Sequence, residues 1–380
     1  KKEQMADSSA KRILFIFGTR PEAIKMAPVI KAFKSNTSLI TKVCITAQHR
    51  EMLDQVLDFF SITPDYDLDL MQKNQDLYTL TSRALLALKI PLEDFKPDLV
   101  LVHGDTTTTM TASLAAFYAG IKVGHIEAGL RTHNLKSPFP EELNRQFTGL
   151  VANIHFAPTT QAKANLLKER IPEDCLCVTG NTVIDALQET VEKVQQQNPG
   201  FAENIPFKTK KIILVTGHRR ENFGAGMQRI CQAIAQLATQ RDDIHFVYPV
   251  HLNPNVKSVV HTILGDHSNI TLIPPLEYPD FVWLLDKSFL IITDSGGVQE
   301  EAPSLGKPVL VTRDTTERPE AVTAGTVKLV GTDAVQLKTE VLRLLEDTEA
   351  YKTMSAAHNP YGDGKAAQRI LDFVLHYFKA

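Results

Sequence analysis

Three carboxylates in the first half of the chain, Asp105, Glu127 and Glu141, are the strongest candidates for proton transfer. Asp105 and Glu127 follow the apolar runs 98–103 and 122–126, which have the character of buried strands. Because open α/β sheets bind ligands at the carboxyl ends of their strands, both side chains are expected at one such edge. Glu141 begins a helical segment further on. We therefore predict general acid–base catalysis by this group.

Each of these residues also has a structural interpretation. Asp105 alone is better explained as a cap for the helix that starts at Thr106. Glu141 and Arg145 have the spacing of an i,i+4 ion pair, which is worth about 0.2–0.5 kcal/mol. Glu127 is harder to explain in this way, because a carboxylate just past a buried strand has little structural use there.

A second set of groups can neutralise phosphates. The turn Ser295-Gly296-Gly297 connects the apolar run 289–293 to a helix predicted over 298–305. Its glycines allow close approach of the backbone to a ligand, and its N–H groups suit a diphosphate, while Glu301 or its neighbour Glu300 could accept bonds from a ribose. An ordinary βα turn explains the same residues about as well. The cationic candidates are Arg20, Lys25, Arg145, His218, Arg219 and Arg313.

Composition excludes several classes of protein. The chain has 380 residues and a formal net charge of −3, without a concentrated basic patch, so nucleic-acid binding is not expected. No apolar run reaches the ~18 residues of a membrane span, and residues 1–11 form a polar leader rather than a signal peptide. We expect a soluble cytoplasmic protein.

No metal is expected. The combination of Asp105, His125 and Glu127 fits no standard set of metal ligands. The cysteines lack zinc-type pairing and indicate buried thiols of a reducing compartment; they are Cys44, Cys175, Cys177 and Cys231.

Strands alternate with helices along the whole chain, which predicts an α/β protein with two Rossmann-like, doubly wound parallel sheets facing a cleft. We place the first domain at 12–180 and the second, which would bind the nucleotide, at 181–364, with a hinge near Gly180. The C-terminal helix, 365–380, is expected to pack back on the first domain. Strands are predicted at 12–17, 43–47, 98–103, 122–126, 154–156, 175–179, 211–216, 245–250, 270–273, 289–293 and 308–312.

Six ordered motifs resemble those of bacterial non-hydrolysing UDP-N-acetylglucosamine 2-epimerases, in register from about Arg12 to the C-terminus. The resemblance implies the two-domain fold of GT-B glycosyltransferases and a homodimer. The motifs are Gly18-Thr-Arg-Pro-Glu22, His103-Gly-Asp-Thr106, His125-Ile-Glu-Ala-Gly-Leu-Arg-Thr132, Pro140-Glu-Glu-Leu-Asn-Arg145, Thr216-Gly-His-Arg-Arg-Glu-Asn222 and Thr293-Asp-Ser-Gly-Gly-Val-Gln-Glu-Glu-Ala302.

The resemblance implies reversible conversion of UDP-N-acetylglucosamine to UDP-N-acetylmannosamine, with neither a metal nor a nicotinamide cofactor. A base removes the proton from sugar C2 while UDP leaves C1 by anti elimination, and both the 2-acetamidoglucal and UDP stay bound. A proton then returns to the other face of C2 and UDP adds again. The product would supply capsule or other surface polysaccharides.

The resemblance also implies roles for single residues. Asp105, Glu127 and Glu141 are the acid/base candidates, and Arg145 and His218 stabilise the departing diphosphate. The remaining candidates for binding UDP or its phosphates are Arg20, Lys25, Arg219, Ser295, Gly296, Gly297, Glu301 and Arg313.

A second molecule of UDP-N-acetylglucosamine is implied at an allosteric, activating site lined by Gln48, His49 and His251. Glu51 and Asn74 stand where some members have Gln and Arg.

Three other functions fit parts of the pattern. A hydrolysing 2-epimerase would release UDP and free N-acetylmannosamine. A GT-B glycosyltransferase would share the fold but would not require the three carboxylates. A non-catalytic UDP-sugar sensor would bind without turnover, and the same carboxylates argue against it.

Overall fold

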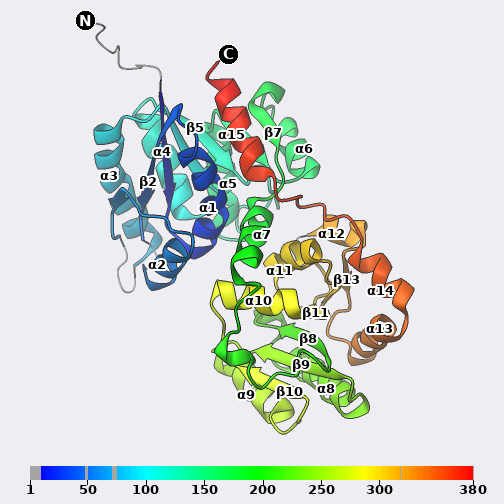
Figure 1. Cartoon of the computed structure of the whole chain (residues 1–380). Helices are drawn as coiled ribbons and strands as arrows, with labels where there is room; N and C mark the ends of the chain where they lie inside the picture. The colour runs from blue at the N-terminus through cyan, green and yellow to red at the C-terminus, as the bar shows by residue number, and fades with distance from the viewer. Residues whose placement is uncertain (1–9, 48–49, 71–74, 317, 380) are drawn as a thin grey trace, which may run out of the picture. The chain divides into compact units, whose positions relative to one another are not determined.

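The computed structural model describes residues 10–47, 50–70, 75–316 and 318–379, and its chain divides into two compact units. Unit 1 comprises Lys1–Ala186 and Gly362–Ala380, and unit 2 comprises Leu187–Tyr361 (Figure 1). The division falls inside helix α7 (Thr182–Val194), a few residues beyond the hinge placed at Gly180.

Unit 1 is built on a seven-stranded sheet with the order β3-β2-β1-β4-β5-β6-β7, in which the described pairs are parallel. Its strands are β1 (Lys11–Phe17), β2 (Leu39–Ile45), β3 (Tyr66–Asp67), β4 (Leu99–His103), β5 (Lys122–Ile126), β6 (Ile154–Ala157) and β7 (Leu176–Val178). Besides α7, its helices are α1 (Arg20–Lys34), α2 (Arg50–Phe59), α3 (Leu77–Phe95), α4 (Thr107–Tyr118), α5 (Glu141–Val151), α6 (Thr160–Lys168) and α15 (Ala366–Tyr377).

Helices cover both faces of this sheet. Successive side chains of a strand point to opposite faces. In β1, Leu14 and Ile16 belong to the core shared with α3 and α4, whereas the Phe15 ring meets Phe33 of α1 at 5.3 Å. The C-terminal helix α15 packs on α1, and its Phe373 meets Phe156 of β6 at 5.6 Å. Both faces are therefore dry, which explains the uninterrupted apolar runs in the central strands.

Unit 2 repeats this plan with six parallel strands in the order β10-β9-β8-β11-β12-β13. The strands are β8 (Lys211–Thr216), β9 (Ile244–Pro249), β10 (Ile270–Ile273), β11 (Leu290–Thr293), β12 (Val309–Val311) and β13 (Val327–Leu329). The helices are α8 (Ala225–Gln240), α9 (Pro254–Leu264), α10 (Tyr278–Lys287), α11 (Gly296–Glu301), α12 (Pro319–Ala324), α13 (Ala334–Glu346) and α14 (Thr348–Ser355).

The predicted fold class, two doubly wound parallel sheets, is confirmed. The sequence analysis missed two edge strands, β3 and β13, which have only two and three residues. The helix expected over 298–305 begins earlier, at Gly296, and its end, Ala302–Leu305, is a 3₁₀ turn. Pro303 has no N–H to continue the α-helical pattern there.

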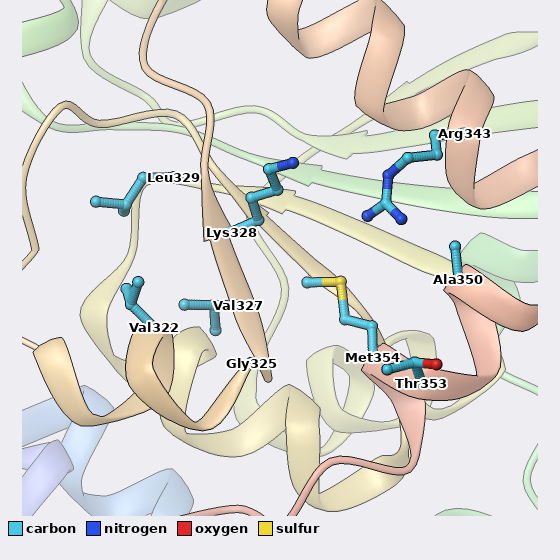
Figure 2. A pocket seen from close by; sticks show the side chains of 9 residues that line it. All are labelled: Val322, Gly325, Val327, Lys328, Leu329, Arg343, Ala350, Thr353 and Met354. Carbon is cyan, nitrogen blue, oxygen red and sulfur yellow. The ribbon is translucent and has the colours of Figure 1, made fainter.

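A cavity of about 570 Å³ lies along β13 in unit 2 (Figure 2). Val327, Lys328 and Leu329 all line it, together with Arg343 and Met354. Consecutive residues of a strand point to opposite faces, so a cavity touched by all three follows the free edge of the sheet. It contains none of the residues predicted to form the site.

No described helix is long and apolar enough to cross a membrane.

Candidate active site

Glu127 lies directly after β5 in an unusual backbone conformation, with φ of 62°. Its carboxylate oxygen Oε2 forms an ion pair with Lys25 Nζ of α1 and accepts a hydrogen bond from Asn181 Nδ2 at 3.0 Å. The buried His103 ring, at the end of β4, places Nε2 3.7 Å from the same oxygen. Burial lowers the pKa of His103 to about 4, so the ring is neutral near pH 7. Lys25 and Asn181 thus hold one acidic side chain, next to a buried neutral ring.

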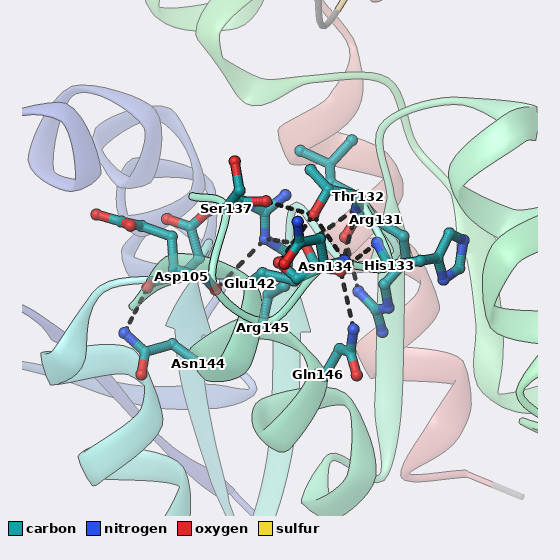
Figure 3. Close-up of polar contacts among 12 residues, drawn as sticks. Asp105, Arg131, Thr132, His133, Asn134, Ser137, Glu142, Asn144, Arg145 and Gln146 are labelled. Carbon is teal, nitrogen blue, oxygen red and sulfur yellow. Dashed lines mark hydrogen bonds and ion pairs between the residues drawn. The ribbon is translucent and has the colours of Figure 1, made fainter. Parts of the chain in front are cut away.

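Asp105 follows β4 and lies next to Arg145, whose Nη2 is 3.2 Å from Asp105 Oδ2 (Figure 3). Burial, opposed by the Arg145 guanidinium, raises the pKa of Asp105 to about 6; the negative charges of Glu127 and Glu141 also raise it. Asn144 fixes the backbone by donating from Nδ2 to Asp105 O at 2.9 Å. A carboxyl group with this pKa exchanges protons readily near neutral pH.

The cap expected from sequence belongs to another residue. Thr106, not Asp105, caps α4, and its hydroxyl accepts from Thr109 N at 3.1 Å. Asp105 is therefore available for chemistry, and the structural interpretation of this residue is wrong. Glu141, the third carboxylate, begins α5 and is half-buried.

Arg145 is oriented by a buried acid that the sequence analysis did not single out. Glu142 is 0% exposed and accepts hydrogen bonds from the backbone N–H of Thr132 and His133 and from Gln146 Nε2. Arg145 Nε lies 3.4 Å from its carboxylate (Figure 3). Glu142 thus joins the loop after β5 to the helix that carries Arg145.

The loops after β1 and β4 are joined through Glu22. This buried carboxylate accepts from the Gly18 and Thr19 backbone N–H groups, at 3.1 and 2.8 Å, and from the Thr106 and Thr109 hydroxyls, at 2.7 and 3.1 Å. Its contacts fix the turn at which α1 begins, and α1 carries Arg20 and Lys25.

In unit 2, the buried Asp294 after β11 holds the loop after β8. Asp294 is 0% exposed and accepts from the backbone N–H of His218 at 3.0 Å, from Arg219 N–H at 2.9 Å and from Asn222 Nδ2 at 3.3 Å. The His218 ring is exposed at its outer side and stacks on His251, with centroids 5.5 Å apart. Desolvation lowers the pKa of His218, and Asp294 opposes this effect.

The turn Ser295–Gly297 follows β11 at the same edge of the sheet. Thr293 Oγ1 accepts from Ser295 N at 2.9 Å, and a Cβ on Gly296 would lie only 3.2 Å from Arg318 Cζ. Arg318 Nε in turn donates to Glu300 Oε1 at 2.7 Å. Any larger residue at this position would press against the guanidinium that lies on the turn, and Arg318 would have to shift by a few tenths of an ångström.

Two further predicted residues have buried neighbours in unit 2. Arg313 follows β12, is 6% exposed and pairs with Glu221 at 2.5 Å. Glu301 is buried beside Tyr278; burial and then the Glu301 charge raise the pKa of that phenol.

The structure therefore brings together Asp105, Glu127, Lys25 and Arg145 in unit 1, and His218, Arg219 and His251 in unit 2. Gln48, His49 and Asn74 lie outside the described residues, and Glu51 is an exposed residue of α2. Among the described residues no group of three His, Cys, Asp or Glu is arranged to hold a metal ion.

The sequence analysis did not assign roles to Glu22, His103, Glu142, Asn181 and Asp294. Four of these lie inside the quoted motifs, and this position could have marked them as candidates for the site. Asn181 lies outside them, and only its place after β7 distinguished it.

Comparison with known proteins gives one consistent result. Residues 31–375 match the family model described as UDP-N-acetylglucosamine 2-epimerase. The UDP-N-acetylglucosamine 2-epimerase of Salmonella typhimurium strain LT2 is 58% identical over 371 residues, which cover 96% of this chain and 99% of the relative. That of Escherichia coli K12 is 59% identical over 366 residues, covering 95% and 97%.

A solved structure shares the fold. The Neisseria meningitidis UDP-GlcNAc 2-epimerase bound to UDP-GlcNAc superimposes with a TM-score of 0.86 at 54% identity, covering 96% of this chain and all of that one. The family predicted from the six motifs is thereby confirmed: the chain belongs to the UDP-N-acetylglucosamine 2-epimerase family.

Proposed function

We propose that this protein interconverts UDP-N-acetylglucosamine and UDP-N-acetylmannosamine without net hydrolysis. The observation that carries the proposal is the pair of carboxylates at the ends of adjacent strands, Asp105 after β4 and Glu127 after β5. Inversion at one carbon requires a proton to leave one face and another to arrive at the opposite face. Two separately supported acid/base groups provide for this.

The reaction proceeds in two balanced halves. One carboxylate takes the C2 proton, the C2–H electron pair forms the C1=C2 double bond, and the C1–O bond breaks as UDP leaves with its electrons. The second group, in its carboxylic acid form, then donates its proton to the other face of C2. The C1=C2 electron pair forms the new C2–H bond, and a phosphate oxygen of UDP forms the bond to C1 again.

We assign the stabilisation of the departing diphosphate to Arg145 and His218, with further binding of UDP by Arg219, Arg313, Glu301 and the Ser295–Gly297 turn. Fixed donors aimed at the developing charge lower the barrier because they need no reorganisation during the reaction. The Asp294 contacts support this role for His218, since they fix the backbone of its loop. Lys25 of α1 pairs with Glu127, and Arg20 is the first residue of the same helix; we assign both to substrate binding.

Proton NMR in D₂O tests the proposal. With UDP-N-acetylglucosamine as the starting compound, we expect UDP-N-acetylmannosamine to accumulate with deuterium at C2 and without free sugar. Free N-acetylmannosamine and UDP in equal amounts would show a hydrolysing 2-epimerase. Binding with no exchange would favour a sensor or, if sugar passes to an acceptor, a glycosyltransferase.

Regulation by a second substrate molecule is part of the proposal. His251, assigned to the activator, stacks on His218, assigned to the diphosphate. A ligand that moves the first ring changes the environment of the second, which would couple the two sites directly.

The cellular setting follows from the proposed reaction. The four cysteines are free thiols, which suits a reducing cytoplasm. We assign the product to the synthesis of surface polysaccharide.

We also propose a homodimer. The supporting observation is that three helices packed side by side in unit 1, α3, α4 and α5, carry exposed apolar side chains, which we call the apolar face. Its exposed members are Leu86, Ile90, Phe117, Tyr118, Leu143 and Leu150.

A further inference from the structure

Glu127 has a backbone conformation that needs support from its surroundings. A φ of 62° lies in the left-handed region, which side chains with a Cβ adopt rarely and at an energetic cost. Such a conformation persists only where surrounding contacts impose it. The contacts made by the side chain therefore matter more here than at an ordinary strand end.

Asn181 makes a contact of fixed direction. Its Oδ1 accepts a hydrogen bond from Val183 N at 3.0 Å, so the amide can be oriented in only one way. The opposite group, Nδ2, consequently points to Glu127 Oε2 at 3.0 Å. Asn181 is 4% exposed, which keeps water from replacing either bond. A planar buried amide defines the position of an oxygen more closely than the flexible ammonium of Lys25 does.

Asn181 also lies where the chain leaves unit 1 and later returns. A Cβ on Gly362, the first residue of the returning segment, would lie 3.5 Å from Asn181 N. Arg369 of α15 donates to Thr179 O at 3.0 Å and pairs with Asp363 at 2.7 Å. The segment that carries Asn181 is thus held by the C-terminal part of the chain.

A second buried carboxylate completes this support. Asp185 of α7 accepts from the backbone N–H groups of Ala366 and Ala367 at 3.2 and 2.9 Å, at the start of α15. The leaving and returning segments are therefore joined on both sides of Asn181.

We propose that Asn181 is a positioning residue for Glu127, holding its carboxylate at the geometry required for proton transfer. Through Asn181, the two segments that link the units also determine where this carboxylate lies. The inference rests on the proposed function, since it assigns Asn181 a part in that reaction.

The test compares Asn181→Asp and Asn181→Ala with the unsubstituted enzyme, using deuterium exchange at C2 and kcat and KM for UDP-N-acetylglucosamine. Asn181→Asp keeps the acceptor for Val183 N and nearly the same shape, but places a second carboxylate against Glu127. We expect kcat to fall about tenfold or more, with KM within about threefold, because binding groups are untouched. A like charge beside Glu127 raises the pKa of its carboxyl group, so the pH profile of kcat should move to higher pH.

Asn181→Ala removes the contact with Glu127 without adding a charge. Its kcat should also fall, but its pH profile should move less than that of Asn181→Asp. Asn165→Asp is the matched control, because Asn165 of α6 donates from Nδ2 to Gly129 O at 3.0 Å, in the loop that also carries Glu127, and among the described residues no contact of Asn165 with that carboxylate is seen. It should retain kcat within about threefold. Thermal melting of each variant reports folding separately.

The outcomes are distinguishable. Absence of interconversion by the unsubstituted enzyme would refute the proposed function. An active enzyme whose Asn181→Ala variant keeps full kcat, or whose Asn181→Asp variant keeps the original pH profile, would refute the positioning role alone. A loss of activity shared equally by Asn165→Asp would assign the effect to loosening of the loop and would also overturn it.

Discussion

Asp105 carries a charge that the fold does not favour. Its pKa rises from an ordinary 3.8 to about 6, so the folded protein binds this proton more tightly than the unfolded chain does. This difference in pKa stabilises the folded protein fully below pH ~4, and the stabilisation is lost as the pH rises through ~6. Residues with this property are common at active sites, where function outweighs stability.

Asp105→Asn should therefore abolish proton transfer without destabilising the protein. We expect kcat to fall by about 10²–10⁴. Such a pKa difference corresponds to about 3 kcal/mol for a fully buried group. Because the side chain is 32% exposed, we expect the free energy of unfolding at pH 8 to rise by about 1 kcal/mol at most.

Urea unfolding at pH 8 and pH 4 checks this prediction. The difference between variant and unsubstituted protein should shrink at pH 4, where the aspartic acid is neutral in the folded protein and only partly ionised in the unfolded chain. A variant that is clearly less stable at pH 8 would contradict it.

The pH dependence of the two directions of the reaction should be identical. Epimerisation takes up and releases no net proton, so its equilibrium constant does not vary with pH. That constant equals the ratio of kcat/KM in the two directions, and both profiles must then share one shape. We expect a limb near pH 6 from Asp105, reported as an apparent pKa of the coupled carboxylates.

Arg145→Gln should move that limb to higher pH, because the guanidinium opposes the rise in the Asp105 pKa. Measurement of kcat/KM from either UDP-sugar between pH 5 and 9 would serve, with Arg145→Lys as the control that keeps the charge. A limb that stays in place in Arg145→Gln would count against the assignment to Asp105, whereas profiles that differ between the two directions would count against epimerisation without a net proton change.

At the scale of elements, single buried acids hold the loops that carry the site. Asp294 joins the ends of β8 and β11, much as Glu22 joins those of β1 and β4. Neighbouring parallel strands are not joined by tight hairpin turns, so the loops at their ends are held together by side-chain hydrogen bonds of this kind.

Asp294→Asn should lower the free energy of unfolding by about 1–3 kcal/mol. The amide has only one oxygen to accept the hydrogen bonds from His218 N, Arg219 N and Asn222 Nδ2, so at least one of these buried donors is left unpaired. Chemical denaturation measures this change. Asp333→Asn at the start of α13 is the control, because Asn caps a helix about as well as Asp does. Equal effects of both substitutions would argue against the special role of Asp294.

Sequence alone predicted the long central strands and the two sheets, because apolar runs such as 98–103 are direct consequences of burial on both faces. It missed β13, since three residues carry no periodic signal. Asp105 and Glu127 could be singled out from their place after strands. Asn181 could not, because its partner Glu127 is 54 positions away and only the fold brings them together.

At the scale of the whole molecule, the apolar face of α3, α4 and α5 should form the dimer contact. Ile90 is 65% exposed and Tyr118 71% exposed on these adjacent helices. Apolar faces of this kind in soluble proteins usually mark interfaces.

Light scattering should give the mass of two 42.2-kDa chains for the unsubstituted protein. Ile90→Glu should reduce it to one, because the introduced charge cannot be buried without a partner. Leu252→Glu is the control, at a residue 70% exposed in unit 2. A mass that is unchanged by Ile90→Glu, or one that Leu252→Glu lowers equally, would place the contact elsewhere.

The return of α15 to unit 1 has a consequence for synthesis on the ribosome. Unit 2, Leu187–Tyr361, is a continuous segment, whereas unit 1 lacks the helix that covers α1 until the final residues have been translated. At ordinary elongation rates this delay is on the order of ten to forty seconds. During it, unit 2 is being synthesised while unit 1 still exposes an apolar surface. Nascent chains of this protein should therefore depend on chaperones chiefly through their first half.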